Sequence, residues 1–279
     1  MPRNETAIQT LQLEKALKKL VRAAQELAAS RDPEDHTALL PFLKDAAFRD
    51  RLDPPDAETT GPEDMNLGRV LRTLGENKMG PGHDSILKLI ADPDFTSDPD
   101  RVDMLLRATV NVRPAPPQVI SFWKKVSDPE GVHMEIAVAV AVENKSAPAI
   151  LFFQERMLDK SLDEESRILW MHEWVMPNRA NTDMLAMCHR LITGPAADFS
   201  NSLKLALAES LFEYRPEEWF GPHHIPTPEP RRNTRRPGRD SLREIAQFVL
   251  EKLSPGPALK LAIETTVKEL DALDKVNAP

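Results

Sequence analysis

Apolar residues recur along most of this chain at the three-to-four-residue spacing of a helix face. Four apolar segments begin at Ile86, Val119, Ile150 and Met184, so their start positions lie 33, 31 and 34 residues apart. Each is followed by a polar or proline-containing break and a second apolar segment, at 100–111, 132–144, 163–176 and 198–214. A period of roughly 30 to 45 residues built from helix pairs is the signature of an α-solenoid. The pattern therefore predicts an all-α fold, an α-α superhelix of antiparallel helix pairs.

Further helices are predicted on both sides of this periodic region. Toward the N-terminus, helical spacing predicts one long helix over residues 6–30 and another over residues 35–51, with Pro41 near its first turn. A helix over residues 66–77 leads into the first repeat. Helices over residues 240–253 and 257–273 follow the last repeat, and we expect them to cap the solenoid, because an open end would expose its apolar stacking face.

Two segments interrupt the helical pattern. Residues 53–64 combine prolines, a glycine and several acids, which predicts a loop. Residues 221–239 hold five prolines and five arginines, and we expect this insertion to be exposed and partly disordered. The predicted organisation is an N-terminal helical segment at 1–52, a loop at 53–64, and helical repeats at 65–279 with the insertion at 221–239.

Two of the breaks between paired helices carry matching residues. Positions 97–100 (Ser-Asp-Pro-Asp) and 127–130 (Ser-Asp-Pro-Glu) are near copies of each other. In each, Ser or Asp can cap the next helix, Pro fits its first turn, and the following acid lies at the positive end of the helix dipole. We expect second helices to begin at these two points.

The stretch from Phe122 to Asn144 resembles the HEAT-repeat pattern, in which an apolar first helix and an Asp-Pro break precede a second helix that alternates Ala with aliphatic residues. Here Asp128-Pro129 forms the break, and residues 136–140 (Ile-Ala-Val-Ala-Val) supply the alternation. Asp92-Pro93, with the apolar residues that follow, resembles a second copy. The resemblance spans about residues 84–214 and is to a repeat class. It implies a curved stack of helix pairs that binds other proteins, and it carries no catalytic residues.

Composition favours short helices ended by prolines over a sheet protein. The chain of 279 residues has only 10 Gly but 25 Pro, and aromatic residues make up 5% of it. Prolines stop helix interiors but are accepted in first turns, whereas strands are enriched in aromatic and β-branched residues. A hydrophobic fraction of 41% is sufficient for a solenoid, because each repeat buries only the face that it shares with its neighbours.

Charge, cysteine content and hydropathy limit the partners and the location. A net charge of −8 disfavours general binding to nucleic acid or anionic membranes. The single cysteine, Cys188, excludes an intramolecular disulfide and a four-cysteine metal site. No apolar run reaches the ~18 residues of a membrane span, and the N-terminus lacks the order of a secretory signal. We expect a cytoplasmic protein, although a chain whose leader had been removed would look the same.

Local motifs give no catalytic or metal site. His172-Glu173 lacks the second His that a zinc-protease helix carries four residues away, and the neighbours Cys188 and His189 would point about 100° apart on a helix. We therefore predict no cofactor, no metal and a non-enzymatic scaffold that binds a protein or peptide on its concave face. Second helices line that face in such stacks. Their polar residues are the candidate contacts: Arg101, Arg107, His133, Glu135, Arg167, His172 and Lys204.

Aromatic and basic residues gather where the period fails. Tyr214, Trp219, His223 and His224 fall in one short run, together with Phe220. One interpretation is a recognition patch, because aromatic residues supply rigid contact area. The other is that the aromatics bury themselves against the repeats and fasten the insertion there.

The arginines of the insertion support two alternative functions. Clustered guanidiniums suit phosphate, so a HEAT-like protein that binds nucleic acid through Arg231, Arg232, Arg235, Arg236 and Arg239 is the second hypothesis. Contact with an acidic protein surface is the other interpretation of this cluster. The third hypothesis is a HEAT-like enzyme, a DNA glycosylase or a cofactor lyase, which would need the aromatic and histidine run ordered into a pocket. HEAT-like glycosylases carry a strongly basic concave face, which this composition does not supply.

Overall fold

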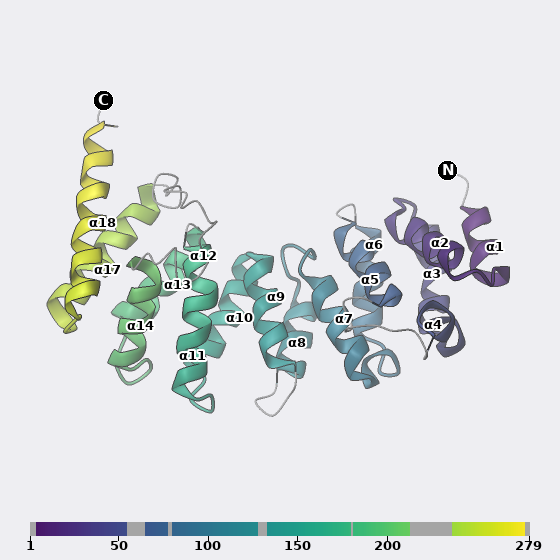
Figure 1. Cartoon of the computed structure of the whole chain (residues 1–279), viewed down its shortest axis with the longest axis horizontal. Helices are drawn as coiled ribbons and strands as arrows, with labels where there is room; N and C mark the ends of the chain where they lie inside the picture. The colour runs from purple at the N-terminus through teal and green to yellow at the C-terminus, as the bar shows by residue number, and fades with distance from the viewer. Residues whose placement is uncertain are drawn as a thin grey trace. The chain divides into compact units, whose positions relative to one another are not determined.

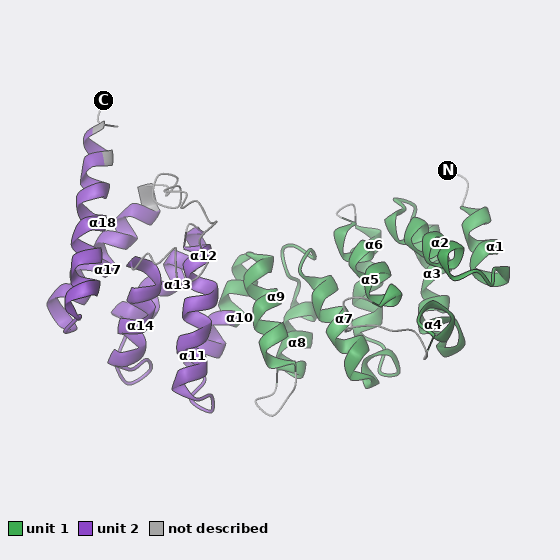
Figure 2. Ribbon diagram, viewed as in Figure 1, with its two compact units in different colours: residues 1–152 green, residues 153–279 purple. Residues whose placement is uncertain are grey.

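The computed structural model describes residues 4–54, 65–77, 80–127, 133–179, 181–212 and 236–276 (Figure 1). Across these residues the chain forms helices and no strand, which confirms the all-α prediction. The chain divides into two compact units, Met1–Phe152 and Phe153–Pro279 (Figure 2). The division falls inside one helix, α10 (Ala147–Leu158).

The first unit contains the helices that precede α10. They are α1 (Glu5–Leu13), α2 (Leu17–Ala29), α3 (Pro33–Lys44), α4 (Ala46–Leu52), α5 (Asn66–Glu76), α6 (Pro81–Ile90), the 3-10 turn η1 (Phe95–Ser97), α7 (Pro99–Thr109), α8 (Pro117–Val126) and α9 (Met134–Asn144). Because α2 packs against α5, the predicted N-terminal segment belongs to the same compact unit as the first predicted repeats.

Helices of the first unit alternate between two layers. In one layer α2 contacts α5, α5 contacts α7, and α7 contacts α9, while in the other α3 contacts α6 and α6 contacts α8. Consecutive helices join the layers, since α6 also contacts α5 and α7, and α8 also contacts α7 and α9. Each of these helices is therefore packed against neighbours in both layers.

The second unit shows the same alternation. Its helices are α11 (Glu164–Trp170), the π-helical turn η2 (Met171–Val175), α12 (Met176–Asn178), α13 (Thr182–Thr193), α14 (Asn201–Phe212), α17 (Arg236–Lys252) and α18 (Pro257–Val276). α14 contacts α11 and η2 on one side and α18 on the other, while α13 contacts α17. The two predicted C-terminal helices are present as α17 and α18, which pack against each other. Because α17 begins at Arg236, residues 236–239 belong to this helix and not to the predicted insertion.

The predicted repeat helices lie where the apolar period places them. The four first helices are present as α6, α8, α10 and α13. Of the two predicted Ser-Asp-Pro starts, the one at 97–100 opens α7. Residues 128–130 of the other lie outside the described residues, and α9 begins only at Met134, without a side-chain cap. An Asp98 carboxylate oxygen accepts the backbone N–H of Arg101 at 3.0 Å, and Pro99 opens α7. Asp163 caps α11 in the same way. Such caps satisfy N–H groups that a helix start leaves without a partner.

A glycine allows α5 and α7 to approach closely. A Cβ on Gly75 would lie 2.1 Å from the carbonyl oxygen of Ala108, so only a residue without a side chain fits there. Leu71 and Leu74 on α5 and Leu105 on α7 are fully buried. Removing such a side chain from water contributes about 1.5–3 kcal/mol, so this packing is a principal source of stability in the first unit.

Two buried asparagines join the end of one helix to a turn two or more helices earlier. The amide nitrogen of Asn77, just after α5, donates to two carbonyl oxygens at the end of α2, at 3.2 and 2.6 Å. That of Asn144, at the end of α9, lies 3.0–3.3 Å from three carbonyl oxygens at and just after the last residue of α7. Buried carbonyls without a donor are costly, so each asparagine stabilises its neighbouring turn.

The predicted helix over residues 6–30 is wrong in extent. It is interrupted between Leu13 and Leu17, and the structure has α1 and α2 in its place. The carboxylate of Glu14 accepts the backbone N–H groups of Lys15 and Ala16, at 3.0 Å each. These amides are satisfied by a side chain instead of by the preceding helical turn, which permits the chain to change direction.

The predicted helix over residues 35–51 is also divided. Asp45 ends α3 and caps α4, where its carboxylate accepts the N–H of Ala47 at 3.3 Å. α3 begins at Pro33, not near Asp35, and Pro33 takes the first-turn position that was predicted for Pro41. Pro41 instead lies inside the helix.

Candidate binding surface

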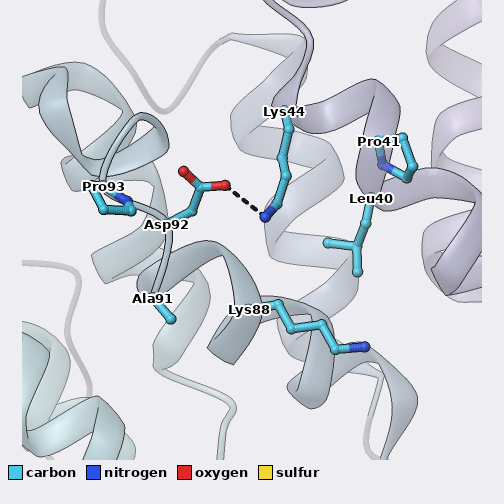
Figure 3. Close-up of a pocket in the computed structure, with 7 residues that line it drawn as sticks. All are labelled: Leu40, Pro41, Lys44, Lys88, Ala91, Asp92 and Pro93. Atoms are coloured by element: carbon cyan, nitrogen blue, oxygen red, sulfur yellow. Dashed lines mark ion pairs between the residues drawn. The ribbon is translucent and has the colours of Figure 1, made fainter.

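Two open hollows lie on either side of the C-terminal turn of α6, in the first unit. The one between α3 and α6, here the α3–α6 hollow, has a volume of about 660 Å³ (Figure 3). The one between α6 and α8, here the α6–α8 hollow, has a volume of about 520 Å³. Leu40, Pro41, Lys44, Lys88, Ala91, Asp92 and Pro93 line the first. Ile90, Thr96, Pro117, Gln118, Ser121, Phe122, Lys125 and Val126 line the second. Most of the exposed lining of both is apolar.

Two lysines stand at different edges of the α3–α6 hollow. The ammonium of Lys44 lies 2.6 Å from the carboxylate of Asp92 and forms an ion pair with it. Lys88 extends from α6 on another side of the hollow, where it is exposed (Figure 3). Among the described residues its ammonium has no ion pair and no hydrogen-bond acceptor. The apolar surface of Leu40 and Ala91 is therefore flanked by one neutralised cation and one available cation.

The wall formed by the turn after α6 is firmly held. A carboxylate oxygen of Asp92 accepts the N–H groups of Asp94 and Phe95, at 3.0 and 3.2 Å. The guanidinium of Arg101 donates to the carbonyl oxygens of the same two residues, at 3.1 and 2.8 Å, and lies 5.7 Å from the centre of the buried Phe95 ring. The hollow is therefore preformed.

The same contacts set the charge of Asp92. Its hydrogen bond from the Lys44 ammonium lowers the pKa of the Asp92 carboxyl, and the backbone N–H groups of Phe95 and Asp94 act in the same direction. The carboxylate consequently remains ionised and paired to lower pH than an isolated aspartate would. The Lys44 ammonium is thus already paired within the fold.

The α6–α8 hollow has an aromatic floor and a polar rim. Phe122 is 4% exposed, and its neighbour Trp123 is fully buried. The indole N–H of Trp123 donates to the Thr109 hydroxyl at 2.9 Å, which ties α8 to the other layer. Ser121 and Lys125 remain exposed at the rim. Like the α3–α6 hollow, it combines apolar lining with a basic residue, and among described residues the Lys125 ammonium has no ion pair.

Basic residues recur in the last turns of the helices that form this layer. Lys44 lies in the last turn of α3, Lys88 in that of α6, and Lys124 and Lys125 in that of α8. Cations at this end are favourable for the helix dipole, by about 0.3–1 kcal/mol each. The dipole accounts for their place along each helix, and the row that results lies beside two apolar hollows.

The structure places the predicted contacts of the first unit in differing environments. Arg101 holds the turn after α6, as described above. Arg107 donates to Asp103 at 2.6 Å, one helical turn away. His133 is half-buried just before α9, and Glu135 is exposed in the first turn of that helix. The interactions found for the two arginines are with their own neighbours in the fold.

Two predicted contacts of the second unit belong to the α11–η2 segment. Arg167 is 8% exposed and donates to the carbonyl oxygen of Met157 at 3.4 Å. His172 lies in η2, where its Nδ1 is 3.2 Å from the hydroxyl of Ser210 on α14. Arg167 is thus an internal group, and His172 joins two packed elements.

Lys204 on α14 is the most deeply buried of the predicted contacts. It is 2% exposed, and its ammonium donates to the carbonyl oxygen of Gly194. The ammonium also lies 5.4 Å from the centre of the Phe248 ring on α17. Burial lowers the pKa of Lys204. The side chain connects the turn before α14 with α17, which leaves it inaccessible to a partner.

Of the remaining predicted residues, Arg239 lies in α17 and donates to the carboxylate of Asp274 at 2.9 Å. The others lie outside the described part of the chain. These are Tyr214, Trp219, His223, His224, Arg231, Arg232 and Arg235, together with the side chain of Arg236, whose backbone opens α17. The recognition patch and the nucleic-acid hypothesis that rest on them stay predictions.

Across the described ranges, no group of three or more His, Cys, Asp and Glu side chains is arranged to hold a metal ion. The helices found there include none that is both long and apolar enough to cross a bilayer. Cys188 is buried, and burial raises the pKa of its thiol. Neither a protein-family model, nor a curated protein, nor a solved structure matches this chain.

The two hollows were not predicted from the sequence, because the candidate contacts were polar residues of the second helices. Two sequence features could have indicated the hollows. Lysines occur in the last turns of α3, α6 and α8, and apolar or small residues near them fall outside the buried face of the helix. Ala91 and Ser121 are such positions, and both are exposed. What sequence could not give is the separation of neighbouring helices, which leaves hollows between them.

Proposed function

We propose that this chain is a HEAT-like α-solenoid. Three observations support the proposal: helix pairs at the expected period, alternation of helices between two layers in each unit, and close contact between successive helices of a layer. A fourth is an asparagine that recurs at or just after the ends of second helices. It stands at positions 77, 111, 144 and 178, which are 34, 33 and 34 residues apart.

We further propose that the protein is a non-enzymatic scaffold that binds another protein through the α3–α6 and α6–α8 hollows. The observation that carries this proposal is the pairing of two preformed apolar hollows on one layer, each with an exposed lysine at its edge. Contact surfaces combine apolar anchoring sites with a polar rim in this way.

The openness of the hollows favours a protein segment over a small molecule. Small-molecule sites enclose most of the surface of their ligand, whereas both hollows here are broad and open to solvent. A peptide can place single side chains into shallow hollows and continue along the surface between them.

The layer of second helices, which the sequence favours, is the alternative surface. Arg101, Arg167 and Lys204 on that layer already make contacts within the fold. The hollows on the layer of first helices are therefore the stronger candidate for the binding surface.

Site-specific photo-crosslinking tests this assignment. A photoreactive amino acid is placed at Gln118 or Ser121, both exposed at the α6–α8 hollow, and at Lys18 on α2 as a matched exposed control. After exposure to an extract of the source cells, we expect a discrete adduct from the hollow positions and none from the control. The captured protein is then identified, purified and titrated against the chain.

The result that contradicts the proposal is equally definite. If the purified candidate binds Ser121→Arg as tightly as the original chain, or if adducts form equally at all three positions, the hollows do not bind this partner. If the photoreactive amino acid forms adducts only when it is placed at Arg107 or Glu135, the binding surface is the second-helix layer.

A further inference from the structure

We propose that the occupant of these hollows is an acidic segment of a protein, bound in the polyproline II conformation, with two apolar side chains three residues apart. This inference rests on the proposed binding function and assigns the chemistry of the partner. Each apolar side chain would occupy one hollow, and neighbouring carboxylates would pair with Lys88 and Lys125.

Lys88 provides the main evidence that the occupant is acidic. The chain has 44 acidic and 36 basic residues, so an exposed lysine has many possible acidic partners within its own fold. Lys44, at another edge of the same hollow, takes such a partner in Asp92. Lys88 takes none among the described residues, although it is exposed beside apolar surface. A carboxylate brought in by a ligand would complete the pair and, close to apolar surface, would be only partly screened by water.

The spacing follows from how far apart the hollows are. They lie on opposite sides of one helix turn, and neighbouring helix axes are separated by about 8–10 Å. A segment in the polyproline II conformation advances about 3.1 Å per residue and completes one turn every three residues. Side chains three residues apart therefore lie on the same face, about 9 Å from each other. Side chains at positions i and i+3 therefore match the two hollows, whereas adjacent apolar residues cannot reach both.

The alternative ligands fit less well. A basic segment would meet Lys88 and Lys125 as like charges, which is unfavourable at close range. A neutral apolar segment would gain burial but leave both ammonium groups without a partner. The acidic segment is the occupant that satisfies the apolar lining and the two cations together.

Fluorescence anisotropy with a defined probe tests the inference. The probe is a labelled peptide, Gly-Asp-Leu-Glu-Asp-Leu-Asp-Gly, whose leucines are three residues apart. One control has the same composition with adjacent leucines, Gly-Asp-Asp-Leu-Leu-Glu-Asp-Gly, and the other replaces every acid with lysine. We expect saturable binding of the probe to the full chain and at least roughly tenfold weaker binding of both controls.

Variants of the chain show where the probe binds. Lys88→Glu should weaken it roughly tenfold, and Lys88→Gln by a smaller factor, because the second removes the charge without reversing it. Lys18→Glu makes the same charge change at an exposed position on α2 and should leave affinity within about twofold. Unchanged thermal unfolding confirms that each variant is folded.

Several results would overturn the inference. One is that the basic or adjacent-leucine peptide binds as tightly as the probe. Another is that Lys88→Glu leaves the affinity for the probe unchanged. The third is that the probe shows no saturable binding up to about 1 mM, a concentration at which the free energy of association is small. If a crosslinked partner still binds through Gln118 and Ser121, the proposed function stands and only its acidic chemistry is wrong. If neither probe nor partner binds there, both proposals fail.

Discussion

Lys88 on α6 in the first unit and Lys204 on α14 in the second are lysines with opposite surroundings. Lys204 is 2% exposed, donates to a backbone carbonyl and lies against the Phe248 ring. Lys88 is exposed at the edge of an apolar hollow, and no described residue pairs with it. From sequence, Lys204 was the predicted contact and Lys88 was not considered.

The difference separates cations that hold the fold together from cations that remain available. A charge is costly to bury unless hydrogen bonds or an aromatic face compensate it, so the internal contacts of Lys204 are evidence of a structural role. An exposed lysine loses little when left in water and can exchange that water for a ligand. The function of a basic residue in this protein therefore depends on what already surrounds it.

The largest expected effect is at Lys204. Lys204→Ala should lower the free energy of unfolding by about 3 kcal/mol, because it removes a buried side chain, its hydrogen bond and its ring contact. Lys204→Met keeps the apolar volume without the charge and should cost about 1 kcal/mol. Urea unfolding measures the loss of unfolding free energy for both variants. A loss below about 0.5 kcal/mol for the alanine variant would show that Lys204 does not stabilise the fold.

Arg101 should show an intermediate effect within the first unit. Arg101→Ala removes the donors to two carbonyl oxygens and the cation over Phe95. We expect a loss of about 1–2 kcal/mol in unfolding free energy and weaker binding of the acidic probe, because one wall of the α3–α6 hollow loosens. Arg72→Ala, at an exposed position on α5, is the control. If the variant is destabilised but binds the acidic probe normally, binding at the α3–α6 hollow does not depend on the turn that Arg101 holds.

The features of the fold that could be predicted from sequence are those that depend on interactions between residues close together in the chain. The apolar period, the caps formed by Asp98 and Asp163, and Pro99 are local signals, and the helices that they predict are present. The break at Glu14 was missed, because it depends on one side chain bonding to adjacent backbone amides. The asparagines at 77, 111, 144 and 178 were a readable repeat that apolar patterning overlooked.

The binding surface depends on tertiary structure, and sequence alone could not locate it. Polarity marked Arg167 and Lys204 as surface residues, but both are buried where helices of the second unit pack. The hollows arise from the separation of α3, α6 and α8, which no residue within a single helix encodes. The lysine row was visible in the sequence, and the apolar space beside it was not.

The pair of Lys44 and Asp92 should have a smaller effect that depends on pH. Lys44→Met should cost less than about 1 kcal/mol near neutral pH, since the pair is partly exposed. The pKa of Asp92 is lowered in the folded state, so its stabilisation is present above the unfolded pKa and is lost as pH falls through the folded value. The difference from the original chain should therefore shrink in acid. A difference that persists below about pH 2 would mean that the pair is not its cause.

Lys88 should show the smallest effect on stability. Lys88→Ala removes an exposed side chain without an internal partner, so the unfolding free energy should change by less than about 0.5 kcal/mol. The same variant should weaken the acidic probe several-fold. A loss of stability above about 1 kcal/mol would place Lys88 with Lys204 among the structural cations.

Methyl NMR of the full chain titrated with the acidic probe tests the central claim most directly, because it reports where the ligand lies. The account predicts that the methyl signals of Leu40, Ala91, Ile90 and Val126, around the two hollows, shift together and saturate with one affinity. Shifts confined to methyl groups of α5, α7 and α9, or no shifts at all, would contradict it.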